Sequence, residues 1–126
     1  MSVERRQIVT ASAPPPAGAY SQGIASGGFL FLAGQGAIDL EGRKLTGPFK
    51  EQARRAFGNL AEVSRAAGGD LRNAVRIGVY LLDMNDFAEM NDVCREFFDD
   101  PLPARTTIQA DLRGFKIEVD AIVRLG

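Results

Sequence analysis

The stretch KIEVDAIVR, residues 116–124, decides the fold, because apolar and polar side chains alternate along most of its length. Successive side chains of a β-strand point to opposite faces of a sheet, so the pattern predicts a strand with one apolar face. That face consists of Ile117, Val119, Ala121 and Val123. If helices cover it, the other face, with Glu118, Asp120 and Ile122, is free of helices.

Three segments upstream are also typical of strands. Residues 29–33 (FLFLA) form a short apolar run between glycines, which indicates a buried strand. Residues 75–81 (VRIGVYL) alternate like the closing strand. Residues 105–111 are separated from the closing strand by only 112–115, a turn of hairpin length, so we predict that the last two strands form a hairpin.

Two segments have the three- and four-residue spacing of amphipathic helices. The first begins with Pro48 in its first turn and ends at Gly68-Gly69. The second begins at Asp86, where Glu89 three residues later suggests a capping box, and ends before Pro101. Their apolar stripes comprise Ala53, Ala56, Phe57, Leu60, Val63 and Ala67 in the first helix, and Phe87, Met90, Val93, Cys94, Phe97 and Phe98 in the second.

The order of these elements predicts an α+β fold with a mixed β-sheet and two helices packed on one face. Residues 35–45 are expected to form a loop or a hairpin between the first strand and the first helix. Nothing along residues 1–126 resembles a linker, so we expect a single domain. The open sheet face mixes apolar and polar residues and is a plausible subunit interface, which predicts an oligomer.

Composition excludes several classes of function. The chain has 126 residues, 15 Lys and Arg against 16 Asp and Glu, a net charge of −1, no histidine and one cysteine. Catalysis by histidine, zinc sites of the Cys/His type and a disulfide within the chain are therefore excluded, and we expect no metal site. No charge surplus favours nucleic acid or a membrane surface, and neither a secretory signal nor a membrane span is recognisable. We expect a cytoplasmic protein.

Arg105 and Glu118 are the strongest candidates for chemistry. Arg105 follows a Pro-containing loop at the start of a strand, where a guanidinium could bind a carboxylate through two parallel hydrogen bonds. Glu118 lies in an otherwise apolar strand, where partial burial would raise its pKa and suit it to donate or accept a proton. The alternatives are an ordinary surface arginine and a solvated strand residue, and Asp120 is either paired with Glu118 or solvated.

Three other residues have two interpretations each. Tyr20 could offer its hydroxyl to a ligand or could simply pack with the hydroxyl in water. Asn91 could cap backbone groups or reach a site. Cys94 lies on an apolar stripe without a basic neighbour, which favours a buried structural thiol over a nucleophile.

Taken together, these segments resemble the Rid family of enamine/imine deaminases, also called the YjgF/YER057c/UK114 family. The resemblance spans about residues 13–123, with all pieces in the family's order. It implies a chorismate-mutase-like fold assembled as a homotrimer, with ligand sites in the clefts between subunits. The matching pieces are Ala19-Tyr20-Ser21-Gln22, Gly34-Gln35, Asp83-Met84-Asn85-Asp86-Phe87, Asn91, Pro103-Ala104-Arg105 and Ile117 to Ile122.

The resemblance also implies roles for single residues. Arg105 matches the arginine that binds the substrate carboxylate, and Glu118 matches the acidic residue at the reacting centre. Tyr20 and Asn91 match residues that line the cleft, and the pair Gly34-Gln35 matches a turn near the site.

Three positions depart from the family pattern. Ala19 stands where close members have proline, and Ala33 stands where they often have serine. Most importantly, Thr107 occupies the place of a family cysteine two residues after the arginine. Imine hydrolysis needs an activated water rather than a covalent thiol, and the backbone carbonyl of Thr107 can still accept a hydrogen bond from the substrate nitrogen.

The resemblance therefore predicts hydrolytic deamination of reactive 2-imino or enamine acids, such as 2-aminoacrylate and 2-iminopropionate, to 2-keto acids and ammonia. No cofactor is required and no covalent thiol takes part. The first alternative is a non-catalytic trimer that binds small 2-keto acids or related carboxylates in a regulatory role, which the Thr107 departure would favour. The second is an activity on RNA, described for some relatives, against which the pI near 5.4 and the absence of clustered Lys and Arg weigh.

Overall fold

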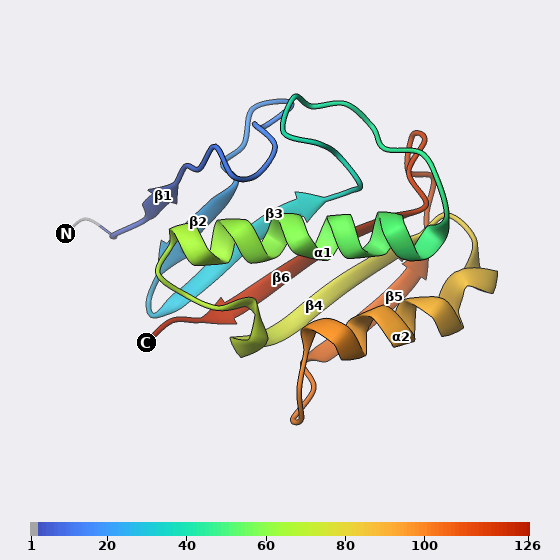
Figure 1. Ribbon diagram of the computed structural model, residues 1–126. Coiled ribbons are helices and arrows are strands. Elements are labelled where there is room, and N and C mark those ends of the chain that lie inside the picture. Colours follow the sequence, from blue (N-terminus) through green and yellow to red (C-terminus); the bar gives the residue numbers. More distant parts are fainter. Residues whose placement is uncertain (1–2) are drawn as a thin grey trace.

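The computed structural model describes residues 3–126, which form a six-stranded sheet with two α-helices on one of its faces (Figure 1). The helices are α1 (Phe49–Ala66) and α2 (Phe87–Phe97), and short 3₁₀ turns precede β4 and α2, at Leu71–Asn73 and Met84–Asp86. The strands are β1 (Arg6–Ile8), β2 (Gly23–Ser26), β3 (Phe29–Gln35), β4 (Ala74–Leu81), β5 (Ala104–Gln109) and β6 (Ile117–Arg124).

The sheet is mixed, as the sequence predicts, with the strand order β1-β2-β3-β6-β4-β5. Only β4 and β5 pair in parallel, while the other neighbours are antiparallel. The short strands β1 and β2 were not predicted. Strand β2 pairs with β3 across a two-residue turn, Gly27-Gly28, in which both residues have positive φ.

The predicted hairpin between residues 105–111 and 116–124 is wrong. Strand β6 lies between β3 and β4, whereas β5 occupies the edge beyond β4. The connection crosses the end of β4, where Ala110 N–H donates to Leu81 O and Leu82 N–H donates to Lys116 O. Because alternate side chains of β6 are buried and β5 is largely exposed, the apolar strand takes the central position.

Both helices form where the spacing predicts them, but their first residues differ from the expectation. Pro48 is the N-cap of α1 rather than a residue of its first turn. The capping box at Asp86 is absent, because the Asp86 side chain makes no capping hydrogen bond. Asp83 instead accepts from Asn85 N–H and starts the 3₁₀ turn that leads into α2.

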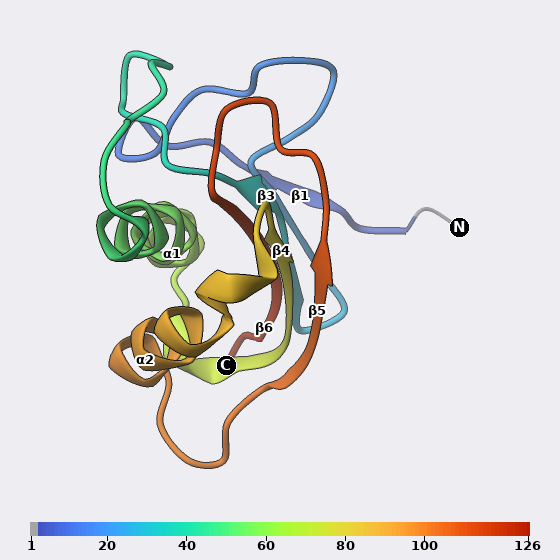
Figure 2. The same ribbon diagram turned by 90° about the vertical axis from the view of Figure 1, so that its right-hand side faces the viewer.

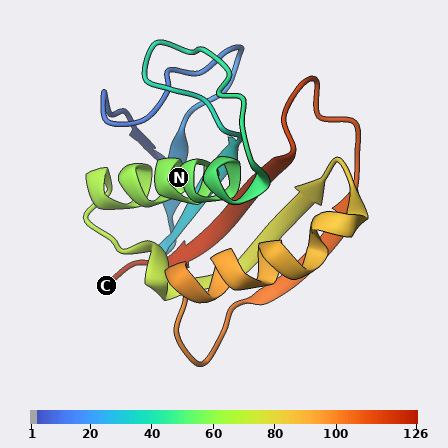
Figure 3. The same cartoon turned by 45° about the vertical axis from the view of Figure 1, so that its right-hand side comes forward.

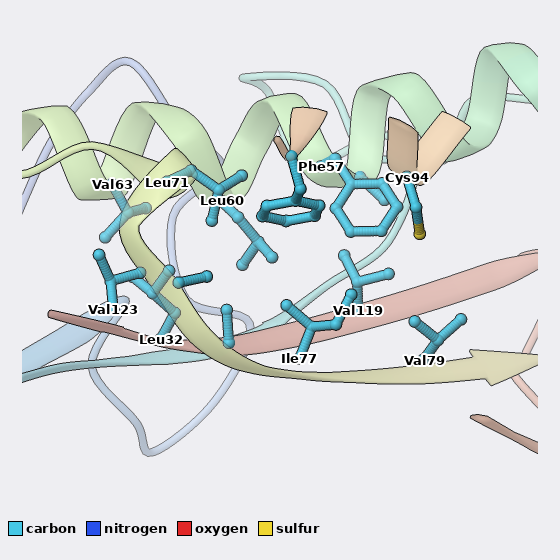
Figure 4. Close-up of a cluster of buried hydrophobic side chains, with 14 of the residues drawn as sticks. Leu32, Phe57, Leu60, Val63, Leu71, Ile77, Val79, Cys94, Val119 and Val123 are labelled. Carbon is cyan, nitrogen blue, oxygen red and sulfur yellow. The ribbon is translucent and has the colours of Figure 1, made fainter. Parts of the chain in front are cut away.

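The hydrophobic core lies between the helices and the sheet. Figure 4 shows Phe57 and Leu60 of α1 facing Ile77 and Val119 of the sheet. The four apolar residues that alternate along β6, from Ile117 to Val123, are at most 3% exposed, which confirms the predicted inward face. Viewed edge-on in Figure 2, both helices lie on the same side of the sheet.

The opposite face of the sheet is not covered by a helix. It carries Phe31 and Ile108, which are 46% and 47% exposed, together with Glu118, as predicted. In residues 3–126, neither helix is long and apolar enough to cross a bilayer.

Candidate functional site

Arg105, at the start of β5, directs its side chain to the helix side of the sheet. Its register partner on β4 is Ile77, a core residue. The Arg105 Nη1 donates a hydrogen bond of 2.7 Å to Asn91 Oδ1 and lies 3.4 Å from Met90 Sδ. The guanidinium carbon also lies 5.4 Å from the centre of the Phe87 ring, a cation–π distance. Helix α2 therefore holds the guanidinium with neutral groups.

This arrangement leaves the charge of Arg105 available to a ligand. Among residues 3–126, no carboxylate lies within salt-bridge distance of Arg105. A guanidinium with one N–H already fixed by Asn91 loses less side-chain freedom when it binds an anion. The sequence identified both residues, but it gave no sign that one positions the other.

Arg105 and Asn91 line a pocket of about 500 Å³. Figure 3 shows the backbone around it, with α2 beside β5 and the loop that leads into β5. Its apolar walls include Ile77, Phe98 and Leu102. Arg95, which the sequence analysis did not single out, also lines it. A concave, partly apolar space with a few cationic groups suits a small carboxylate.

Cys94 lies at the same pocket and is 7% exposed, as expected for a buried thiol. The apolar stripe of α2 supplies no basic neighbour, but Arg105 Nη1 lies 3.9 Å from the Cys94 Sγ. That neighbour comes from β5, which the helix pattern could not show. Burial raises the pKa of the Cys94 thiol, and Arg105 opposes this only in part, so the thiol stays protonated.

Glu118 lies on the open face of the sheet, beside Tyr80 in the register of β4 and β6. Its carboxylate extends over Gly34 of β3, where a Cβ atom would lie 2.7 Å from Glu118 Oε2. Partial burial raises the pKa of Glu118, and the nearby negative charge of Asp120 raises it further. The raised pKa agrees with the expectation from the sequence, and Gly34 is the residue that leaves space for the carboxylate.

Asp120 extends the opposite way, toward β4. Its Oδ2 accepts a hydrogen bond of 3.0 Å from Tyr80 Oη, and Arg76 Nη1 lies 4.0 Å from its Oδ1. A Cβ atom at Gly78 would lie 2.5 Å from Asp120 Oδ1, so this carboxylate too rests over a glycine. The hydrogen bond to Asp120 raises the pKa of Tyr80, which keeps the phenol protonated. The sequence pattern indicates Asp120 as a candidate but carries no signal for Tyr80.

The remaining candidates are Tyr20, Gln35 and Thr107. Tyr20 is 50% exposed in the loop before β2, and its hydroxyl accepts a hydrogen bond from Ala17 N–H. Gln35 is buried at the end of β3. Thr107 lies two residues after Arg105 on the same side of β5, and its Oγ1 is buried without a hydrogen-bond partner among the described residues.

Within one chain, Arg105 and Glu118 do not meet. Arg105 pairs with the core residue Ile77 of β4, whereas Glu118 pairs with Tyr80 of the same strand. Ile77 and Tyr80 lie an odd number of positions apart along β4, so their side chains point to opposite faces. Alternation therefore places the side chains of Arg105 and Glu118 on opposite faces of the sheet. A site that uses both needs a second chain.

Comparison with known proteins places these features in a family. The sequence profile of the family described as endoribonuclease L-PSP matches residues 10–125. A RutC family protein from Pyrococcus horikoshii is 42% identical over 118 residues, covering 91% of this chain and 94% of that protein. A 2-iminobutanoate/2-iminopropanoate deaminase from Mus musculus is 37% identical over 128 residues, covering 99% and 95%. Relatives with the same deaminase description occur in other animals.

A further relative bears on location. The mitochondrial protein mmf2 from Schizosaccharomyces pombe is 43% identical over 110 residues, covering 83% of this chain and 86% of that protein. The cytoplasmic location expected from the sequence therefore stays a prediction.

Solved structures share the fold over nearly the whole chain. RidA from an Antarctic Psychrobacter species has a TM-score of 0.90 at 36% identity and covers 96% of this chain and 100% of its own. TdcF from E. coli, solved with bound serine, has a TM-score of 0.86 at 29% identity and covers 96% and 99%. The mixed sheet with two helices thus matches the fold of these proteins.

Proposed function

Because this chain belongs to the endoribonuclease L-PSP family, also called the YjgF or Rid family, we propose that it hydrolyses 2-imino acids and their enamine tautomers to 2-keto acids and ammonia. The observation that carries the proposal is Arg105, a guanidinium held by the neutral groups of α2 at the mouth of a pocket. Relatives described as deaminases, at 36–37% identity, support the same reaction class.

The site is completed between subunits of a homotrimer. Because Arg105 and Glu118 lie on opposite faces of one sheet, Arg105 of one subunit faces Glu118 of the next. The exposed Phe31 and Ile108 on the open face support this assembly, since they would leave water when the faces meet. Tyr20 and the Gly34-Gln35 segment line the cleft from the side of Glu118.

Each group then has one task in the reaction. Arg105 binds the substrate carboxylate, and the backbone carbonyl of Thr107 accepts a hydrogen bond from the substrate nitrogen. Glu118 acts as the general acid–base group. The imine nitrogen gains a proton, water adds to the imine carbon, and ammonia leaves as the C=O bond forms. One positioned acid–base group contributes roughly 10²–10⁴-fold, enough for an intermediate that also hydrolyses unaided. Cys94, kept as a protonated thiol by burial, takes no covalent part.

A coupled assay tests the proposal. An amino-acid oxidase generates 2-imino acids of several side-chain sizes, and semicarbazide traps the imine while the protein is added in increasing amounts. We expect semicarbazone formation to fall with the wild type and not with Arg105→Ala, which loses the carboxylate-binding group. The matched control is Arg5→Ala, an exposed arginine outside the pocket, which should act like the wild type. An active Arg105→Ala protein would contradict the assignment.

The second candidate is a non-catalytic trimer that binds small 2-keto acids in a regulatory role. Thr107 in place of the family cysteine favours it, because a changed residue beside Arg105 could accompany a lost reaction. In that case, 2-keto acids would bind to the wild type in an Arg105-dependent manner while no imine is consumed in the coupled assay.

A further inference from the structure

The pocket beside Arg105 contains a second cation. Arg95 lies four residues after Asn91 on α2, so the two side chains are neighbours on one side of the helix. Asn91 in turn binds the guanidinium of Arg105. Two arginines therefore line the pocket, and none of the residues that line it is acidic.

The positive charge of Arg95 is not neutralised by its own helix. The acidic residues that could otherwise pair with it are Asp92, one helical turn before it, and Asp99, just beyond the end of α2. Asp92 lies 3.5 Å from Lys50 of α1, and Asp99 lies 2.8 Å from Arg72 before β4. Glu96, the next residue, lies 2.9 Å from Arg54 of α1. In residues 3–126, no carboxylate lies within salt-bridge distance of Arg95.

The shape of the pocket suits a longer ligand than the smallest imines. Its volume of about 500 Å³ falls within the range of sites for small molecules, and Ile77, Phe98 and Leu102 provide apolar surface for a carbon chain. A ligand with a single carboxylate would engage Arg105 and leave Arg95 without a partner. A ligand with a carboxylate at each end would engage both.

We propose that Arg95 and Arg105 together form a dicarboxylate subsite, which selects imines of acidic amino acids such as aspartate and glutamate. The inference rests on the proposed function: Arg105 binds the carboxylate next to the imine carbon, and Arg95 binds the distal carboxylate. The reaction is otherwise the same, since 2-iminoglutarate and water give 2-oxoglutarate and ammonia. Arg95 is thus a residue of specificity and does not take part in bond making.

The kinetic test compares substrates within each variant. We expect Arg95→Gln to lower the ratio of kcat/KM for 2-iminoglutarate over that for 2-iminobutanoate by roughly 10- to 100-fold, the loss typical of one charge-assisted hydrogen bond. Most of the change should be in KM, because the contact forms in the ground state as well. Arg95→Lys should restore part of the ratio, since it keeps the charge. Arg65→Gln, an exposed arginine of α1 outside this pocket, is the matched control and should leave the ratio unchanged.

A binding experiment separates this inference from the proposed function. Calorimetric titration with 2-oxoglutarate and with 2-oxobutanoate measures the affinity of each product without turnover. Tighter binding of 2-oxoglutarate that is lost in Arg95→Gln would support the subsite even if the wild type consumed no imine. Turnover of neutral imines with no preference for 2-oxoglutarate, or a preference unchanged in Arg95→Gln, would overturn the subsite and leave the proposed function intact.

Discussion

The charged side chains on the two faces of the sheet have different kinds of neighbours. On the helix side, Arg105 is held by an amide, a thioether and an aromatic ring, so its charge is positioned without being neutralised. On the open face, Asp120 accepts a hydrogen bond from Tyr80 and lies near Arg76, whereas Glu118 has the carboxylate of Asp120 as its charged neighbour. Within residues 3–126, the helix side therefore presents a cation without a charged partner, whereas the open face presents a carboxylate whose pKa is raised by burial and by Asp120.

The largest expected effect on the open face follows from adding one methyl group. Gly34→Ala places a Cβ 2.7 Å from Glu118 Oε2 and forces the carboxylate away from β3. Because only the end of a flexible side chain must move, we expect little change in stability but a fall in kcat toward that of Glu118→Gln, roughly 10²-fold. The coupled assay measures kcat, and chemical denaturation measures stability.

The matched control for this change is Gly58→Ala in α1, where a Cβ would meet no atom within 4 Å. It should keep full activity and add about 0.5–1 kcal/mol to the free energy of unfolding, because alanine favours a helix over glycine. Full activity in Gly34→Ala would show that the position of Glu118 does not matter.

A second prediction concerns pH. The pKa of Glu118 is raised above its ordinary value of 4.5, so ionising it costs more in the folded than in the unfolded state. As the pH rises from 4.5 through the folded pKa of Glu118, the wild type loses stability that an uncharged side chain would keep. We expect Glu118→Gln to be more stable than the wild type at pH 7, with the difference disappearing as the pH falls below 4.5. Thermal unfolding across this range measures it, and a difference that is independent of pH would argue against burial as the cause.

The smallest expected effect concerns the neighbouring carboxylate. Tyr80→Phe removes the hydroxyl that donates to Asp120, and the free energy of unfolding should fall by about 1 kcal/mol, as is usual for one hydrogen bond. The helix side should not respond, so Arg105-dependent binding of 2-oxobutanoate should stay at the wild-type affinity. Weakened binding in this variant would show that Tyr80, on the open face, takes part in binding at the Arg105 site.

The sequence predicts which face of the sheet a strand residue occupies, but it does not predict the order of the strands. Alternation along residues 116–124 identifies the buried face of β6 and places Glu118 on the open face, because the period of a strand is a local property. Strand order is not local, which is why the hairpin between residues 105–111 and 116–124 was predicted and is absent: the chain first crosses the end of β4.

The same limit applies to the site. Sequence reasoning could select Arg105 and Asn91 separately, from a strand start and from the edge of a helical stripe. Their hydrogen bond exists only because β5 pairs in parallel with β4 and returns beneath α2. Tyr80 and Arg95 carried no signal at all, since each resembles an ordinary surface residue until the tertiary fold places it beside Asp120 or the pocket.

The central claim is that Arg105 and Glu118 act together across a boundary between chains, and mixed oligomers test it most directly. Arg105→Ala and Glu118→Gln chains, each with a different affinity tag, are produced together and purified through both tags. Each chain supplies the group that the other lacks, so we predict that an inactive pair regains roughly a third of the wild-type activity, because purification through both tags keeps only mixed trimers and each of these has one complete site out of three. Mixed oligomers that stay as inactive as either variant alone would contradict the claim, because both groups would then have to come from one chain.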